Sequence, residues 1–257
     1  MPESSPSFAA LKRQFAMSEP CSDARGRFAL GCPTIDTALG GGLARGRLHE
    51  VFAAQEEDGA STAGFALMLA LRACDAGETI FWIRQEAGAR IAGRIHAPGL
   101  AELGADPRRI LFADTPDEAA TLRAAADALR SPVIGAVLIA PWGKAPMLDL
   151  TASRRLTLAA EQSGVTAILL RGAVEPPPSA ATSRWRVSAA PSIPLEADAP
   201  GHPAFMVDLL RHRSGLSASG WRLEWDRDRL AFRAPPLSVA LAPLAAERRA
   251  DAERRFG

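Results

Sequence analysis

"FALGCPTIDTALGGGLARGRLHEVF", residues 28–52, is the stretch that decides the fold. Its three consecutive glycines, Gly40 to Gly42, indicate a tight turn, because glycine adopts backbone conformations that other residues avoid. The segment 46–52 then predicts a strand, and "TAGFALMLALRACDAG" (62–77) predicts a helix that is apolar around nearly its whole circumference. A strand that leads through a polar turn into a buried helix is typical of an α/β protein with a large core.

Further along the chain, apolar strands alternate with helices. Continuous apolar strands are predicted at 79–83, 108–114, 133–140 and 165–172. The helix between the second and third of these has a clear start, with Thr115 as the expected cap and Glu118 completing a capping box. Alternation of this kind indicates a central, mainly parallel twisted sheet with helices on both faces.

Beyond Gly172 the helical patterns stop and the sequence becomes rich in β-strand signals. Four strands are predicted, at 184–190, 205–213, 220–226 and 229–234, and in the third Trp221, Leu223 and Trp225 alternate toward one face. We therefore expect a β-rich C-terminal extension of the sheet. The predicted organisation is an N-terminal helix and linker (1–26), an α/β domain with this extension (27–233), and a tail that is disordered or ordered by a partner (234–257).

Composition and charge exclude several classes of protein. The chain has 257 residues, 47% of them hydrophobic and 23% charged, and its formal net charge of +1 creates no global attraction to nucleic acid or membrane. Its three cysteines show no CxxC spacing and its four histidines form no metal-ligand pattern. The start lacks the pattern of a secretory signal, and no stretch is apolar over a bilayer-spanning length. We therefore expect a cytoplasmic protein that makes no membrane contact.

The stretch 28–52 resembles the segment that leads into the ATP site of RecA-type recombinases. That family has a Gly-x-x-x-Leu/Ile-Asp-x-x-Leu-Gly-Gly-Gly-Leu run before a Gly-Arg-hydrophobic-x-Glu strand. The matching residues here are Gly31, Ile35, Asp36, Leu39, Gly40, Gly41, Gly42, Leu43, Gly46, Arg47, Leu48 and Glu50. The predicted order of helices and strands also matches through about residue 171, so the resemblance implies a RecA-like P-loop fold over most of the chain.

Within this superfamily the chain resembles the ImuA family of inducible mutagenesis accessory proteins. The resemblance rests on an altered phosphate loop, on "RRLTLAAEQSGVTAILLR" (154–171), and on the late segments "VDLLRHRSG" (207–215) and "GWRLEWD" (220–226). It implies a role in SOS-induced translesion DNA synthesis. It also implies three protein partners, which are the polymerase-like scaffold protein ImuB, an error-prone replicative-type DNA polymerase, and RecA.

The altered loop follows the strand 46–52. A phosphate loop of the form GxxxxGK[ST] uses glycines to expose backbone N–H groups, a lysine to neutralise phosphate charge and a hydroxyl to hold magnesium. In this frame the first glycine has become Ala54 and the lysine has become Ala60, whereas Gly59 and Ser61 remain with Thr62 beside them. The three residues before Gly59 are acidic and repel an anionic ligand. We predict a degenerate remnant that binds neither ATP nor metal.

Two further positions bear on catalysis. The strand on the magnesium side ends at Ala140, where the family has a carboxylate. Glu86 is the one candidate relic, because the family's catalytic glutamate follows the corresponding strand. A lone glutamate with neither lysine nor metal carboxylate cannot organise phosphoryl transfer, so we interpret Glu86 as a solvated loop acid.

The DNA-binding loops of the family correspond here to "APWGKAPM" (140–147) and "GAVEPPPSAATSRWR" (172–186). The first is short and has one lysine, and prolines stiffen the second and remove hydrogen-bond donors. Trp185 falls in a predicted strand, which favours a core position over stacking on bases. We expect any DNA contact to be weak or indirect.

Three features are candidates for binding protein partners. The segment 7–17 predicts an amphipathic helix, and Trp142 lies in a loop, where an aromatic side chain either anchors a partner or packs. The tail carries arginines mixed with acids, which indicates a solvated helix face or a docking helix. The candidate residues are Phe8, Leu11, Phe15, Trp142, Arg248 and Arg249.

The sequence thus predicts a non-catalytic RecA-like adaptor of the translesion machinery. Two alternatives remain open. One is a weak DNA-dependent ATPase or recombinase-like DNA-binding protein, with its loop rescued by an arginine from a partner. The other is a SulA-like cell-division inhibitor, a shrunken relative of the same fold, although the intact stretch 28–52 and the complete strand series argue against it.

Overall fold

A computed structural model describes residues 26–93, 95–196 and 199–235. The predicted N-terminal helix and linker (1–26) lie outside the described residues except for residue 26. The predicted tail (234–257) also lies outside them except for residues 234 and 235. The candidate partner-binding residues in those two segments are Phe8, Leu11, Phe15, Arg248 and Arg249.

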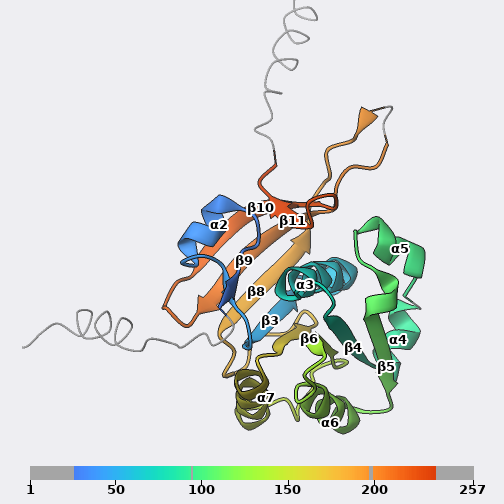
Figure 1. The fold of residues 1–257 in the computed structure, drawn as a ribbon, viewed down its shortest axis with the longest axis vertical. Coiled ribbons are helices and arrows are strands. Elements are labelled where there is room, and N and C mark those ends of the chain that lie inside the picture. The colour runs from blue at the N-terminus through green and yellow to red at the C-terminus, as the bar shows by residue number, and fades with distance from the viewer. Residues whose placement is uncertain (1–25, 94, 197–198, 236–257) are drawn as a thin grey trace, which may run out of the picture.

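Nine strands form one sheet through the molecule, in the order β11-β10-β9-β8-β3-β7-β6-β4-β5 (Figure 1). The six strands from β8 to β5 run parallel to one another, whereas β9, β10 and β11 are joined antiparallel. This confirms the predicted mainly parallel sheet with a β-rich extension. The strands are β3 (Leu48–Ala53), β4 (Thr79–Gln85), β5 (Ile110–Thr115), β6 (Ile134–Ala140), β7 (Thr166–Arg171), β8 (Ser183–Ala189), β9 (Ala204–His212), β10 (Ala218–Asp226) and β11 (Ala231–Arg233).

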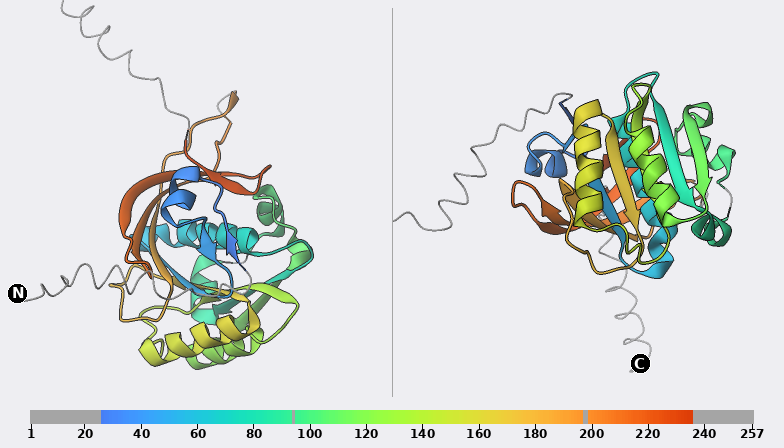
Figure 2. Two further views of the ribbon diagram at one scale, coloured as in Figure 1. Left: turned by 60° about the vertical axis from the view of Figure 1, so that its left-hand side comes forward. Right: turned by 90° about the horizontal axis from the view of Figure 1, so that it is seen from below.

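Helices cover both faces of the parallel part of the sheet (Figure 2). The longer ones are α3 (Gly59–Ala73) on one face, and α6 (Glu118–Ala128) and α7 (Leu150–Ser163) side by side on the other. The remaining helices are α2 (Pro33–Ala38), α4 (Glu86–Ala92), α5 (Ala97–Glu102), and the 3-10 turns η1 (Glu56–Asp58) and η2 (Pro107–Arg109). None of the helices in the described part of the chain is long and apolar enough to cross a lipid bilayer.

The C-terminal extension shares the core of the α3 face. Phe65 of α3 packs against Phe232 of β11 with ring centroids 5.0 Å apart, and Trp225 of β10 contacts the same Phe232 ring at 5.0 Å. Trp185 of β8 is fully buried in this core, as its place in a predicted strand indicated, and Leu223 lies on the same side as Trp225. Because these aromatic side chains bury large apolar areas, β8 to β11 are integral to the core.

The lead-in segment forms a two-stranded hairpin, β1 (Arg27–Phe28) with β2 (Leu43–Ala44), around α2. The Asp36 carboxylate accepts hydrogen bonds from the N–H groups of Leu30 (2.7 Å) and Gly31 (2.9 Å), which fixes the turn before α2. Gly42 has φ of +109°, and a Cβ there would lie 2.1 Å from the Phe28 carbonyl oxygen. The third glycine of the run is therefore required both by its backbone conformation and by close packing.

The start of α6 differs from the prediction. Thr115 is the last residue of β5, and the cap is Asp117, whose carboxylate accepts the N–H of Ala120 at 2.7 Å. The Thr115 hydroxyl is not available as a cap, because it donates to the Arg84 carbonyl at 3.1 Å, and the Asp117 carboxylate takes the cap position. The Thr115 hydroxyl also bonds to the hydroxyl of Thr121 at 2.6 Å.

Candidate functional site

The carboxyl ends of the parallel strands meet at one edge of the sheet, where open α/β sheets bind their ligands. β3 ends at Ala53, β4 at Gln85, β6 at Ala140 and β7 at Arg171. The segment 54–62 connects β3 to α3 at this edge. The structure therefore places the predicted phosphate-loop remnant where a ligand site of this fold lies.

The loop itself is a compact turn that runs directly into α3. Ala54 donates its N–H to the Val187 carbonyl (2.9 Å), and η1 continues into Gly59, which has helical backbone angles (φ −55°, ψ −42°). The Gly59 N–H is donated to the carbonyl of Glu56. Ala60 is exposed and Ser61 half-buried on the first turn of α3. The backbone donor at the start of the helix thus has an acceptor within the chain.

Asp58 holds this turn against β8. Its carboxylate accepts the N–H of Ala189 at 2.8 Å and the N–H of Gln55 at 3.2 Å, and its carbonyl accepts the hydroxyl of Thr62 at 2.8 Å. Thr62 is buried, whereas Glu56 is exposed. Glu56 and Glu57 are therefore exposed acids of a surface turn. Asp58 differs from them, because it links this turn to β8.

The side chain of Gln85, the last residue of β4, links this strand to the loop after β6. Gln85 directly precedes Glu86, the candidate relic of the family's catalytic glutamate. Gln85 accepts the N–H of Trp142 at 3.0 Å, and Glu86 is the exposed first residue of α4. Trp142 is 45% exposed and packs against Gly88, where a Cβ would lie 2.8 Å from the indole ring. In the described part of the chain, no group of three or more His, Cys, Asp or Glu side chains could hold a metal ion.

A buried charge cluster lies on the α7 face near the same edge. Glu50 of β3 accepts hydrogen bonds from the Arg184 guanidinium (2.7 Å) and the Ser179 hydroxyl (2.6 Å). Arg184 also donates to the Pro177 carbonyl (2.6 Å) and lies 5.3 Å from the centre of the Phe52 ring. Arg184 is thus an internal partner of Glu50 and also holds the Pro-rich loop 172–182.

Arg171 connects the two loops that correspond to DNA-binding loops. It is 5% exposed, donates to the Lys144 carbonyl at 3.0 Å and lies 5.9 Å from the Phe52 ring centre. Its Nε and Nη1 have no hydrogen-bond partner among the described residues. Burial lowers the pKa of Arg171, while the negative charges of Glu50 and Glu118 oppose that shift. Arg171 is therefore buried beneath the loop 140–147, which it contacts through the Lys144 carbonyl, and does not face solvent.

His49, the second residue of β3, is completely buried. One ring nitrogen lies 2.9 Å from the Ala44 carbonyl and the other 2.7 Å from the Ser183 hydroxyl, which also accepts from the indole N–H of Trp185 at 2.8 Å. Burial lowers the pKa of His49 to about 4. The neutral ring, with a proton on the nitrogen that faces Ala44, satisfies every one of these bonds.

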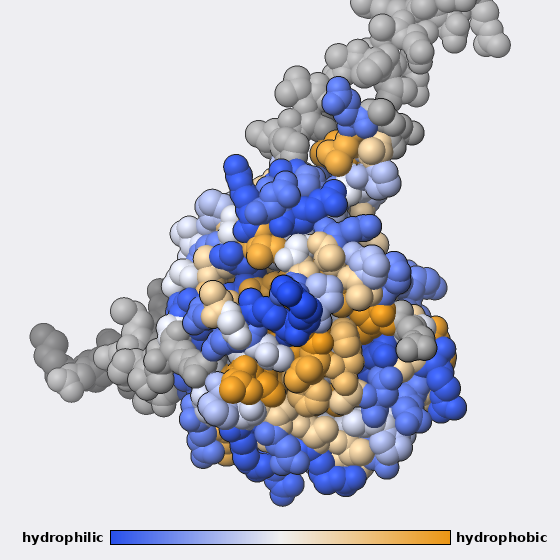
Figure 3. All heavy atoms as spheres, turned by 45° about the vertical axis from the view of Figure 1, so that its right-hand side comes forward, coloured by the Kyte–Doolittle hydropathy of each residue, from blue (hydrophilic) through white to orange (hydrophobic). Residues whose placement is uncertain are grey.

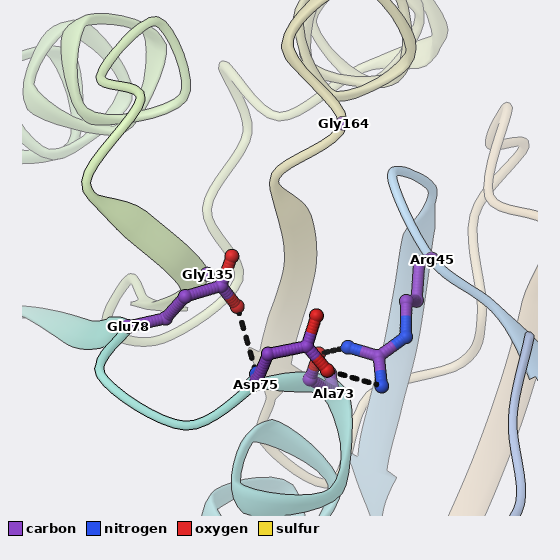
Figure 4. A pocket seen from close by; sticks show the side chains of 6 residues that line it. All are labelled: Arg45, Ala73, Asp75, Glu78, Gly135 and Gly164. Carbon is purple, nitrogen blue, oxygen red and sulfur yellow. Dashed lines mark hydrogen bonds and ion pairs between the residues drawn. The ribbon is translucent and has the colours of Figure 1, made fainter. Parts of the chain in front are cut away.

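A cavity of about 270 Å³ lies at the opposite, amino edge of the parallel strands (Figure 4). Gly135 near the start of β6 and Gly164 just before β7 form part of its wall. Arg45 pairs with Asp75 (3.2 Å), and Glu78 accepts the N–H of Asp75 (2.8 Å). The charged groups of this cavity are engaged with one another, and none of them belongs to the candidate site.

Comparisons with known proteins agree with the sequence resemblance. No family model matches the chain. Protein ImuA of Caulobacter vibrioides, in strains NA1000 / CB15N and CB 15, is 36% identical over 211 residues, which is 76% of this chain and 82% of the relative. The crystal structure of the RadB recombinase has a TM-score of 0.55 and 14% sequence identity, and the match covers 81% of this chain and 100% of the RadB chain.

The two similarities establish different things. The RadB likeness confirms the RecA-like fold that residues 28–52 indicated, and at 14% identity it concerns the fold alone. The similarity to Protein ImuA reaches 36% identity and covers most of both chains. On that basis, the chain belongs to the ImuA family.

Proposed function

We propose that this protein is a non-catalytic accessory protein of SOS-induced, error-prone translesion DNA synthesis. It acts by binding other proteins, namely ImuB, the error-prone polymerase and RecA, and it uses neither ATP nor a metal ion. Membership of the ImuA family supports the process, and the RecA-like fold supports an origin from a nucleotide-dependent scaffold. DNA contact, where it occurs, is weak or indirect.

The observation that carries the proposal is the chemistry of the turn 54–62. A lysine about 4 Å from a phosphate charge near a protein surface contributes about 4 kcal/mol, and Ala60 stands in its place. The start of a helix offers only about 0.3–2 kcal/mol to an anion. The Asp58 carboxylate and its acidic neighbours oppose that contribution, and the Gly59 N–H is already donated to Glu56. Lost neutralisation and repulsion therefore outweigh what remains.

The magnesium side of the edge supports the same conclusion. β6 ends at Ala140, so it supplies no carboxylate for the ion, and Glu86 is an exposed residue on α4. Magnesium at phosphate sites is held by carboxylate or hydroxyl oxygen together with the phosphates themselves. The residues present do not fit magnesium-bound ATP, so no phosphoryl-transfer step is assigned to this edge.

An apolar sheet edge supports binding to proteins. β5 is the outer strand of the parallel part, and among the described residues it pairs with β4 alone. It carries two exposed apolar side chains, Leu111 (54%) and Phe112 (41%), and the side of the molecule that bears this strand shows apolar surface among hydrophilic side chains (Figure 3). Asp114 and Pro116 protect the carboxyl end of this strand against pairing with another strand, so we expect a partner protein to contact its exposed apolar side chains.

Two measurements test this proposal. The first is ATP binding and hydrolysis by the purified full chain, with and without single-stranded DNA, beside RecA as the positive control. We expect no magnesium-dependent binding at about 1 mM ATP and no effect of Ser61→Ala. The second is co-purification with ImuB, which we expect to succeed. ATP hydrolysis at a recombinase-like rate that Ser61→Ala abolishes would contradict the proposal, and so would failure to bind any of the three proteins.

A further inference from the structure

The solvent-facing side of α7 combines an exposed apolar side chain with two arginines. Its exposed residues follow one helical stripe, namely Thr151, Arg154, Arg155, Leu158 and Gln162. Leu156 and Ala160 face inward and are buried in the core of that face. The stripe therefore has an apolar residue, Leu158, next to two arginines one turn earlier. Figure 2 shows α7 on the outside of the sheet beside α6.

The charge of this stripe is not balanced within the described residues. Arg154 and Arg155 make no ion pair or hydrogen bond there with their side chains, and neither does the side chain of Lys144 in the loop before the helix. Of the two acids in the same segment, Asp149 keeps its charge at the start of α7, and Glu161 is neutralised by an ion pair. Asp149 caps α7 by accepting the N–H of Ala152 at 2.7 Å, and Glu161 pairs with Arg47 of the sheet. The local surface is therefore cationic.

Large apolar side chains lie within this cationic surface. Leu158 is 55% exposed, and Met147, three residues before the start of α7, is also 55% exposed. An apolar centre with a charged rim is the usual anatomy of a protein–protein interface. Single-stranded nucleic acid is instead held by aromatic stacking platforms and a longer run of cations, and the α7 stripe has no aromatic residue.

We propose that the stripe Thr151–Gln162 of α7 is a docking surface for an acidic segment of a partner protein that carries an apolar anchor side chain. Carboxylates of the partner pair with Arg154 and Arg155, and the apolar anchor packs on Leu158. This inference rests on the proposed adaptor function and adds the surface and the chemistry of the partner segment.

The helix that carries the stripe is held firmly from its other side. The Ser153 hydroxyl accepts the N–H of Ala180 at 3.1 Å, and Gly164 ends the helix in the left-handed conformation with φ of +78°. Substitutions on the exposed stripe therefore leave these supports intact and test binding rather than folding. A preordered helix also binds a partner without the entropic cost of ordering it first.

The experiment compares two variants with a control on the neighbouring helix. The variants are Arg154→Glu with Arg155→Glu, and Leu158→Ala. The control is Arg123→Glu on α6, where an exposed arginine also lacks an ion pair within the described residues. Each full-length protein is checked by thermal unfolding, then titrated with ImuB, the polymerase and RecA separately at low and high salt, and with a dT30 oligonucleotide.

We expect at least one protein to bind the wild type, with affinity about tenfold or more lower for both stripe variants and unchanged for the control. Binding should also weaken with salt, because the arginines pair with carboxylates. Unchanged protein binding by both stripe variants would overturn the docking surface and leave the adaptor function standing. Loss of oligonucleotide binding alone would make the stripe a nucleic-acid surface and overturn it too. Failure of the wild type to bind any of the proteins would overturn both proposals.

Discussion

Acidification should destabilise this protein through His49, and substitution by glutamine should remove that effect. The ring is completely buried, and its two nitrogens face the Ala44 carbonyl and the Ser183 hydroxyl in an arrangement that suits the neutral form. Burial is the main cause that lowers its pKa from 6.5 to about 4. Between these values the unfolded chain takes up a proton that the native chain does not.

Proton linkage gives both the sign and the size of the effect. Since the folded pKa is the lower one, the stabilisation is fully present above the unfolded pKa of 6.5 and is lost as the pH falls toward 4. The loss is about 1.4 kcal/mol for each pH unit within the window. The free energy of unfolding should therefore fall by about 2 kcal/mol between about pH 7.5 and about pH 5 from His49 alone.

The assay is urea unfolding followed by tryptophan fluorescence at several pH values in this range, for the wild type and His49→Gln. Glutamine retains an N–H donor for the Ala44 carbonyl but does not titrate. Burial also lowers the pKa of His212, but His212 and the carboxylates titrate in both proteins. The difference between the two curves therefore gives the contribution of His49 to the pH dependence. Parallel curves would refute the reasoning, because they would mean that His49 has the same pKa in the folded and unfolded states.

Three further predictions concern stability and are measured by the same urea unfolding. Gly42→Ala should lower the free energy of unfolding by at least about 2 kcal/mol, whereas Gly64→Ala, in open space on α3, should raise it by about 0.5–1 kcal/mol. Asp58→Ala should cost about 1–3 kcal/mol, because two backbone N–H groups lose their acceptor. Glu50→Gln should cost about 3–5 kcal/mol by leaving the Arg184 charge unpaired, and Glu50→Leu combined with Arg184→Met should cost less than that single change.

Local patterns in the sequence predicted most of the fold. Continuous apolar strands indicated the parallel sheet, and the alternation of Trp221, Leu223 and Trp225 identified the inner face of β10. The predicted cap of α6 was wrong by two residues, because Thr115 and Asp117 are both good cap residues and the hydrogen bonds that engage the Thr115 hydroxyl come from tertiary packing.

The contacts of the candidate site could not be predicted in the same way, because they join distant parts of the chain. Asp58 and Ala189 are 131 residues apart, and Glu50 and Arg184 are 134 residues apart. The alternation of β8 places Trp185 in the core and thus turns Arg184 to the other face, but nothing local identifies Glu50 as its partner. Only the register of β3 against β8 brings them together.

The role of Asp58 follows from where its carboxylate lies. In a nucleotide-binding α/β protein, an anion from the ligand sits at the turn before the helix and orders the loop there. In this chain the loop itself carries an anion, the Asp58 carboxylate, which accepts the N–H of Ala189 at the end of β8. Asp58 therefore holds the turn 54–62 against β8 through contacts within the chain. If the adaptor function is correct, partner binding does not depend on a nucleotide, and the surfaces on β5 and α7 are available as soon as the protein folds.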